Sequence, residues 1–331
     1  MDALTTALLT FLGSAAFVVI GGIGLARFGD ELAEKTGWGT LWVGTLLVGI
    51  ATSLPELTVN ISSVWLEDSP GIALGNVFGA NMLNVFVLGV VALIFGASKI
   101  FSKQGRDTEL LILVGIAMVG IAGLVALTGD VKLGPTSLGG LLLVAGYIAG
   151  MRWVYTAGRT PHMHLEDIPQ PTGGARNAWT GFGISVVVVI VAGRFLAASA
   201  HSLADITGIG ASFTGVLLVS IVTTLPEGSV TVAASLRRSY GIVLGNVFGS
   251  CAFNVSIIFF ADLFYTSGPL LGAMRNAHFV AAAAAFVLMS MGYALLVTYN
   301  KGTMIWARTF TPIIPVLYVV ALYFVYTLSH R

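Results

Sequence analysis

Residues 44–66 read GTLLVGIATSLPELTVNISSVWL and residues 71–85 read GIALGNVFGANMLNV, and this pair of blocks decides the fold. The pair returns later as GVLLVSIVTTLPEGSV at 215–230 and GIVLGNVFGSCAFNV at 241–255. Aligning Glu56 with Glu227 sets an offset of 171 residues (227 minus 56). In both copies a glutamate stands within an apolar segment, directly after a helix-breaking proline. A chain that contains this arrangement twice is predicted to build a site from it.

The composition identifies the class of protein. The chain has 331 residues, of which 56% are hydrophobic and only 9% are charged, and its mean hydropathy is +0.92. Soluble domains carry about 25% charged residues, so this composition predicts an integral membrane protein in contact with the lipid bilayer. The net charge of +1 and the lack of a basic tract argue against a nucleic-acid partner. The single cysteine, Cys251, excludes an internal disulfide framework.

Ten apolar segments are long enough to cross a membrane, since a spanning helix needs about 20 residues. They lie at 4–27, 40–66, 71–97, 108–128, 134–156, 178–203, 211–236, 241–263, 277–298 and 309–328. The only long polar connection falls between the two copies. We therefore predict a first five-helix repeat at 1–156, a cytoplasmic linker at 157–177 and a second five-helix repeat at 178–331.

The positive charges predict how these spans are oriented. The odd-numbered connections hold twelve of the sixteen lysines and arginines. Cytoplasmic loops carry this excess, so both termini are expected outside. Because each repeat has an odd number of spans, the two repeats enter the membrane from opposite sides. Inverted repeats with interrupted helices at the midplane are typical of secondary transporters. The predicted fold is all-α, with helices 2, 3, 7 and 8 broken around a midplane ion site.

Oxygen-bearing side chains cluster around each proline. Pro55 cannot donate a hydrogen bond to the carbonyl of Ala51, which is thereby freed from the helix. Thr52 and Ser53 precede Glu56 by four and three residues, so hydroxyls and carboxylate share one helix face. The second copy repeats the pattern with Thr223, Thr224 and Glu227.

The neighbouring blocks add amides and one further hydroxyl. Asn84 ends the first GNVFG block, and Ser250 and Asn254 stand four residues apart in the second. Ca²⁺ and Na⁺ prefer oxygen ligands, and two carboxylates match the charge of one Ca²⁺. No histidine or cysteine cluster points to zinc or copper. For Asn76, Asn246 and Asn81 we favour a packing or capping role.

The paired TSLPE/TTLPE and GNVFG blocks resemble the two repeats of the sodium/calcium exchanger family, within the cation/Ca²⁺ antiporter superfamily, in its prokaryotic ten-helix form. The resemblance implies that Glu56 and Glu227 are the central Ca²⁺ ligands. It also implies that hydroxyls line the Na⁺ and Ca²⁺ positions and that three further side chains complete the ring. The hydroxyls belong to Thr52, Ser53, Thr223 and Thr224. The three further side chains are Ser250, Asn84 and Asn254.

Two positions depart from the pattern of the sodium-coupled prokaryotic members. Ala80 stands where the first repeat usually has serine, and Asn254 stands where the second repeat often has aspartate. The site therefore has two carboxylates instead of three. Either departure is a reason to consider a different number of bound Na⁺ ions, or H⁺ as the coupling ion.

We predict a secondary active antiporter that exchanges Ca²⁺ for Na⁺ by alternating access, with spans 1 and 6 sliding past a fixed core. Exchange of Ca²⁺ for H⁺ is the alternative, and a divalent cation channel is a less favoured one. No catalytic constellation supports an enzyme, and no cofactor is expected beyond the transported ions. The expected location is the plasma membrane, the inner membrane of a bacterial cell. The oligomeric state is left open.

Overall fold

The structure is a computed structural model that describes residues 3–66, 68–158, 175–207, 217, 219–302 and 304–329. It is helical apart from a two-stranded antiparallel hairpin, β1 (Lys132–Leu133) and β2 (Thr136–Ser137). The helices of the first half are α1 (Ala3–Thr36), α2 (Thr40–Trp42), the π-helix η1 (Val43–Val48), α3 (Gly49–Thr52), α4 (Leu54–Trp65), α5 (Pro70–Phe95), α6 (Ala97–Phe101), α7 (Arg106–Thr128) and α8 (Leu138–Gly158). Those of the second half are α9 (Arg176–Thr207), α11 (Ser220–Thr223), α12 (Leu225–Leu236), α13 (Tyr240–Asp262), the 3₁₀-helix η3 (Leu270–Ala273), α14 (Asn276–Asn300) and α15 (Met304–Ser329).

The predicted spans correspond closely to these helices. Nine helices in the described part of the chain are long and apolar enough to cross a membrane. The remaining predicted span, 211–236, begins outside the described residues and continues as α11 and α12. The prediction of an all-α membrane protein is therefore confirmed. Most of the predicted linker, 157–177, lies outside the described residues, so the domain boundaries stay a prediction.

The second and seventh spans are broken where the sequence predicts it. In the second, α3 ends and α4 begins at Ser53, whose φ and ψ are −88° and 5°. In the seventh, α11 and α12 meet at Thr224 in the same way. The cause is the proline two residues later, since it has no N–H to donate and its ring displaces the preceding turn. Each break turns one span into two half-helices.

The prediction that the third and eighth spans are also broken is wrong. The corresponding helices, α5 and α13, run without interruption for 26 and 23 residues. Their glycines alone do not break a helix that is packed inside a membrane protein. The only proline in either helix is Pro70, the first residue of α5, where a missing N–H costs nothing.

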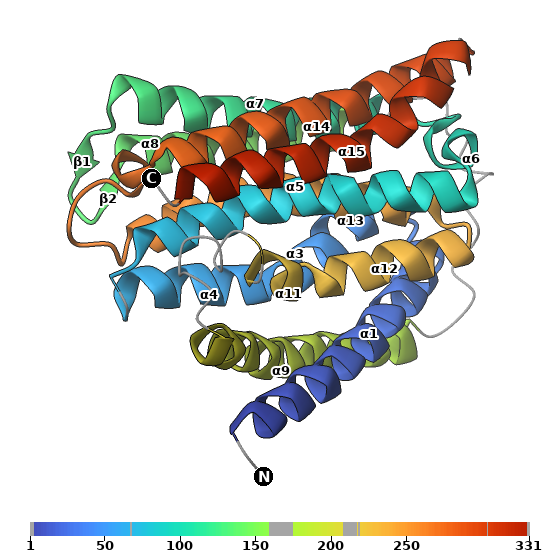
Figure 1. Cartoon of the computed structure of the whole chain (residues 1–331). Helices are drawn as coiled ribbons and strands as arrows, with labels where there is room; N and C mark the ends of the chain where they lie inside the picture. Colours follow the sequence, from blue (N-terminus) through green and yellow to red (C-terminus); the bar gives the residue numbers. More distant parts are fainter. Residues whose placement is uncertain are drawn as a thin grey trace.

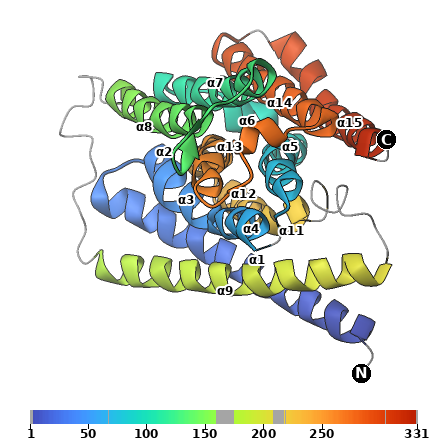
Figure 2. The ribbon, with the colours of Figure 1, turned by 90° about the vertical axis from the view of Figure 1, so that its left-hand side faces the viewer.

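The helices form a core and an outer layer, and the outer layer consists of α1 and α9. Helices α1 and α9 pack against each other and lie together on one side of the molecule, as two perpendicular views show (Figures 1 and 2). Helices α5 and α13 occupy the centre, and nearly every residue of α13 is buried. Helices α7, α8, α14 and α15 cover the side opposite to α1 and α9. Spans 1 and 6 thus correspond to a pair of helices that pack on each other at one side of the molecule, and that they slide stays a prediction.

Glycines bring η1 and α13 into backbone contact. A Cβ atom added to Gly245 would lie 2.5 Å from the carbonyl oxygen of Leu41. One added to Gly249 would lie 2.9 Å from Cα of Thr45. Small residues at such spacing allow membrane helices to approach closely, and here they place α13 directly beside the half-helix that leads to Ser53.

Contacts between connections agree with ten membrane crossings. Asp30, at the end of α1, binds Arg237 after α12, and both lie in odd-numbered connections. Lys132, between α7 and α8, donates to the carbonyl of Tyr265 after α13, and both lie in even-numbered ones. Each contact therefore joins connections predicted on the same side of the membrane. Which side faces the cytoplasm stays a prediction.

Candidate ion-binding site

The two glutamates lie at the starts of half-helices. Glu56 is in the first turn of α4 and Glu227 is in the first turn of α12, and both side chains are fully buried. The N-terminus of a helix carries partial positive charge that stabilises a carboxylate. The two carboxyl groups act on each other electrostatically. Figure 1 shows α4 and α12 in one row of the core, one from each repeat.

Hydroxyl groups cross between the repeats. Ser53 Oγ donates a hydrogen bond of 3.0 Å to Oε1 of Glu227. The Thr52 side chain also lies near Glu227, and those of Thr223 and Thr224 lie near Glu56, without a hydrogen bond to the Glu56 carboxylate among the described residues. The hydroxyls that precede one glutamate therefore lie near the other, and only Ser53 donates a hydrogen bond across the repeats to a glutamate carboxylate in the described part of the chain.

Several oxygen atoms at this place have no hydrogen-bond partner among the described residues. They are Oε1 and Oε2 of Glu56, Oε2 of Glu227 and Oγ1 of Thr224; Oδ1 of Asn254, on α13, is also unpaired. Buried polar atoms are nearly always paired in proteins, and each exception needs an explanation. A group of unpaired oxygens around two carboxylates has the chemistry of a site for a hard cation.

The other predicted residues are buried in the same core. None of the nine predicted side chains exposes more than 2% of its surface. Ser250 Oγ, on α13, donates to the carbonyl of Gly49 at the start of α3, over 3.2 Å. Asn254 Nδ2 donates to Asn81 Oδ1, over 3.3 Å. Asn84 is buried on α5, and its Nδ2 is unpaired within the described part of the chain. That these residues bind an ion stays a prediction.

Asn76 and Asn246 contact threonines of the candidate site, in addition to the packing or capping role that the sequence favours. Thr52 Oγ1 lies 3.4 Å from Asn246 Oδ1, and Thr223 Oγ1 lies 3.2 Å from Asn76 Oδ1. Asn246 Nδ2 in turn donates to the carbonyl of Glu227, over 3.0 Å. Each threonine can thus give its one proton to an amide oxygen, which leaves its lone pairs free to bind a cation. The repeated GN dipeptide was the signal for this pair.

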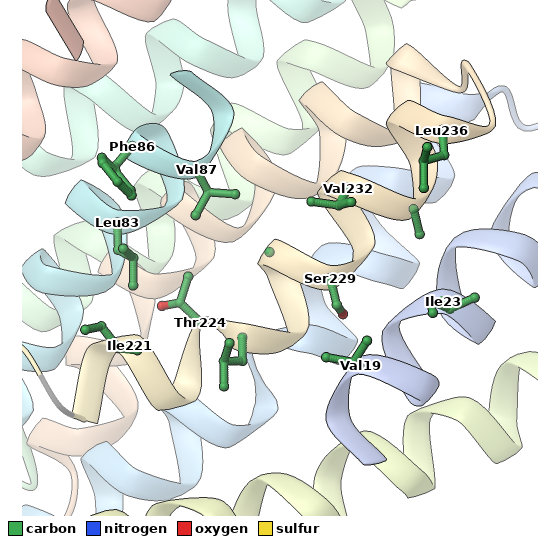
Figure 3. A pocket seen from close by; sticks show the side chains of 13 residues that line it. Val19, Ile23, Leu83, Phe86, Val87, Ile221, Thr224, Ser229, Val232 and Leu236 are labelled. Carbon is green, nitrogen blue, oxygen red and sulfur yellow. The ribbon is translucent and has the colours of Figure 1, made fainter. Parts of the chain in front are cut away.

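An apolar cavity of about 540 Å³ lies beside this site, between α1, α5 and α12. Leu83 and Val87 line one side, and Val19 and Ile23 of α1 line another (Figure 3). Thr224 is the only one of the nine predicted site residues in its wall. The cavity offers little for a cation to bind, and the candidate oxygen ligands lie instead in the polar cluster between α4, α12 and α13.

Comparison with known proteins identifies the family to which the chain belongs. Residues 6–156 and 177–328 match the family described as sodium/calcium exchanger protein. The sodium/calcium exchanger MaX1 of Methanosarcina acetivorans is 24% identical over 90% of this chain and 93% of its own. The inner membrane protein YrbG of Escherichia coli is 25% identical over 72% of this chain and 74% of its own.

A solved structure of the sodium-calcium exchanger NCX_Mj has the same fold. It superimposes with a TM-score of 0.71 over 96% of this chain and 98% of its own, at 21% identity. Because the family match covers both repeats and nearly the whole chain, the identification does not depend on any single relative. The chain belongs to the sodium/calcium exchanger family, and it is a multi-pass membrane transporter and not an enzyme.

Proposed function

We propose that this protein exchanges Ca²⁺ for Na⁺ through one site between Glu56 and Glu227. The observation that carries the proposal is the group of buried oxygens around two carboxylates that have no hydrogen-bond partner among the described residues. Two buried negative charges close together are unfavourable unless an opposite charge compensates them. One Ca²⁺ compensates both, and it takes six to eight oxygen ligands. The predicted hydroxyl and amide ligands complete such a set.

The same oxygens explain why the two ions would be exchanged. Na⁺ also binds hydroxyl and carboxylate oxygens, so it competes with Ca²⁺ for Glu56 and Glu227. A site that both ions need cannot hold both at once. Alternating access then makes the outward movement of one ion depend on the inward movement of the other.

The outer layer supplies the moving part of this proposal. Helices α1 and α9 pack mainly on each other, and α1 also contacts α12, which carries Glu227. Gly22 of α1 lies directly against Ser229 of α12, with no room for a side chain. A contact between two small residues leaves no large side chain protruding across it. It therefore suits a sliding movement of α1 and α9 that opens the site to one side of the membrane and then to the other.

Coupling to H⁺ is a second candidate, and the ligand set favours considering it. Ala80 is fully buried and offers a methyl group in place of a hydroxyl. Asn254 offers an amide in place of a carboxylate. With fewer ligands and less negative charge, the site has less to hold Na⁺, and protonation of Glu56 or Glu227 would release Ca²⁺ in its place.

A flux experiment on the purified full-length protein in proteoliposomes tests these proposals. Uptake of ⁴⁵Ca²⁺ is measured with an outward Na⁺ gradient, an outward H⁺ gradient, and no gradient. We expect uptake to follow the Na⁺ gradient. Uptake driven only by the H⁺ gradient would replace Na⁺ by H⁺ as the coupling ion, and equal uptake without a gradient would indicate a channel.

Glutamine variants test the site itself. Glu56→Gln or Glu227→Gln removes one of two compensating charges, and such a loss costs about 2–5 kcal/mol in buried pairs. We expect Ca²⁺ uptake to fall by roughly 100-fold. Glu34→Gln, at an exposed position near the end of α1, is the control and should transport normally. Normal uptake by Glu56→Gln would remove the site assignment.

The cellular location is proposed from charge and similarity. The odd-numbered connections carry most of the positive charge, which places them in the cytoplasm and both termini outside. A relative is named an inner membrane protein, which supports the cell's inner membrane as the location. This orientation is tested by introducing a cysteine near the N-terminus of the protein and labelling it with a thiol reagent in intact cells.

A further inference from the structure

We infer that Asn81 sets the orientation of the Asn254 amide, so that the carbonyl oxygen and not the NH₂ group of Asn254 faces the bound cation. Asn81 is thereby a positioning residue on α5 that acts through a ligand on α13. The inference rests on the proposed function, in which Asn254 binds the transported ion.

The hydrogen-bond chain leaves one arrangement. Asn81 Nδ2 lies 3.1 Å from the backbone carbonyl of Cys251. A carbonyl can only accept, so Asn81 must present its NH₂ group there and its oxygen on the other side. That oxygen lies 3.3 Å from Nδ2 of Asn254. Because an amide oxygen also only accepts, Asn254 must present its NH₂ group to Asn81.

The consequence is visible at the other end of the Asn254 amide. Its Oδ1 is buried and has no partner in the described part of the protein. An amide oxygen is a ligand for Ca²⁺ and Na⁺, whereas an NH₂ group in its place would direct donors at the cation. The two ends of an amide have nearly the same shape, so only a hydrogen-bond partner such as Asn81 decides between them.

This arrangement exists in one repeat only. Beyond the first block the offset between the repeats is 170 residues (241 minus 71), which aligns Asn81 with Cys251 and Asn84 with Asn254. Where the first repeat supplies an amide to hold Asn254, the second supplies a thiol, which is a weak hydrogen-bond group. Consistent with this, Nδ2 of Asn84 is unpaired among the described residues. The hydrogen bond between Asn81 and Asn254 therefore has no counterpart at the aligned positions of the other repeat.

A double-mutant cycle tests the inference. The Michaelis constant for ⁴⁵Ca²⁺ uptake is measured for the reconstituted full-length protein and for Asn81→Leu, each with Asn254 and with Asn254→Asp. We expect Asn81→Leu to raise the constant about tenfold when position 254 is asparagine, as for the loss of one ligand's correct orientation. Because a carboxylate has an oxygen on both sides, we expect less than a twofold change in the Asn254→Asp background.

The other outcomes separate the inference from the proposed function. If Asn81→Leu raised the Michaelis constant equally in both backgrounds, Asn81 would only pack α5 against α13, and the inference would be overturned. A normal constant for Asn254→Leu would overturn the assignment of Asn254 as a ligand. An impaired Asn254→Leu beside a normal Asn81→Leu would overturn the inference alone.

Two further variants make the comparison secure. Ser256→Ala removes a buried hydroxyl of α13 that donates to the carbonyl of Phe253 in the same helix, over 2.7 Å, and to no other described residue, and it should leave the Michaelis constant unchanged. If Asn81→Leu does not reach the membrane, Asn81→Ala in the same two backgrounds gives the same test, with the same expected difference.

Discussion

Ser53 Oγ donates a 3.0 Å hydrogen bond to Oε1 of Glu227, so a hydroxyl of the first repeat orients a carboxylate of the second. On the other side, Thr223 and Thr224 of the second repeat lie near Glu56 of the first, whose carboxylate oxygens are unpaired among the described residues. Neither repeat therefore completes the surroundings of its own glutamate. Each proline break therefore places its preceding hydroxyls near the glutamate of the opposite half-helix.

The Ser53 hydrogen bond can be tested by removing the hydroxyl. Ser53→Ala leaves Glu227 Oε1 without its donor, and hydrogen bonds to charged groups contribute about 1.5–3 kcal/mol. We expect the Michaelis constant for Ca²⁺ uptake to rise roughly tenfold. Thr58→Ala, on the exposed face of the same half-helix α4, is the control and should leave it unchanged. Equal constants for Ser53→Ala and the parent would show that this contact does not orient the site.

The contact of Gly22 with Ser229 gives a test of the sliding layer. A Cβ atom added to Gly22 would lie 2.8 Å from the Cβ atom of Ser229. Gly22→Val should therefore push α1 away from α12 and reduce the uptake rate several-fold, at an unchanged level of folded protein. Gly13→Val is the matched control on α1, since nothing lies within 4 Å of that position. Adding Ser229→Gly should restore part of the rate, and a rate unaffected by Gly22→Val would argue against this interface.

The ion pair of Asp30 with Arg237 ties the end of α1 to the core. Asp30 also accepts a hydrogen bond from Ser239 Oγ, and the Asp30 side chain is largely buried. Arg237→Gln should loosen α1 at this end and shift the balance between the two access states. We expect the ratio of the Michaelis constants in right-side-out and inside-out vesicles to change several-fold. The neighbouring exposed residue provides the control Arg238→Gln, and the same ratio in both variants would exclude a role for the ion pair.

Lys132 closes the opposite end of α13. Its Nζ donates to the carbonyls of Tyr265 and Gly268, over 2.7 and 3.0 Å, and lies 3.7 Å from the buried carboxylate of Asp262. Lys132→Met leaves that carboxylate without its cation, which should lower the free energy of unfolding by about 2 kcal/mol or more. The measurement is thermal unfolding in detergent, with the exposed Lys99→Met as control. We expect an unchanged Michaelis constant, and an unchanged unfolding midpoint would contradict the prediction.

The fold could be predicted from the sequence because hydrocarbon thickness sets the length of every apolar segment. The breaks at Ser53 and Thr224 were predictable for an equally local reason, the missing N–H of Pro55 and Pro226. The third and eighth spans were mispredicted because glycine and asparagine in GNVFG resemble a helix break. In α13 the glycines of this block serve instead as close contacts, and in both helices the asparagines serve as hydrogen-bond partners of the site threonines.

The residues of the candidate site were predictable where the repeat shows them twice, as with Glu56 and Glu227. The support for Asn254 was not predictable, because its partner Asn81 lies 173 residues away on another helix. Asn81 also breaks the repeat symmetry, since its aligned residue is Cys251. A pairing that is absent from one repeat leaves no periodic signal, so only the three-dimensional arrangement reveals it.

The complete burial of Cys251 has a practical consequence for measuring conformational change in this transporter by site-directed labelling. It is the only thiol in the sequence and it is fully buried between core helices. Spin labels or fluorophores would therefore attach to cysteines added on exposed faces without first replacing the native one. One label on α1 and another on α14 would report, by the distance between them, how far the outer layer travels during a transport cycle.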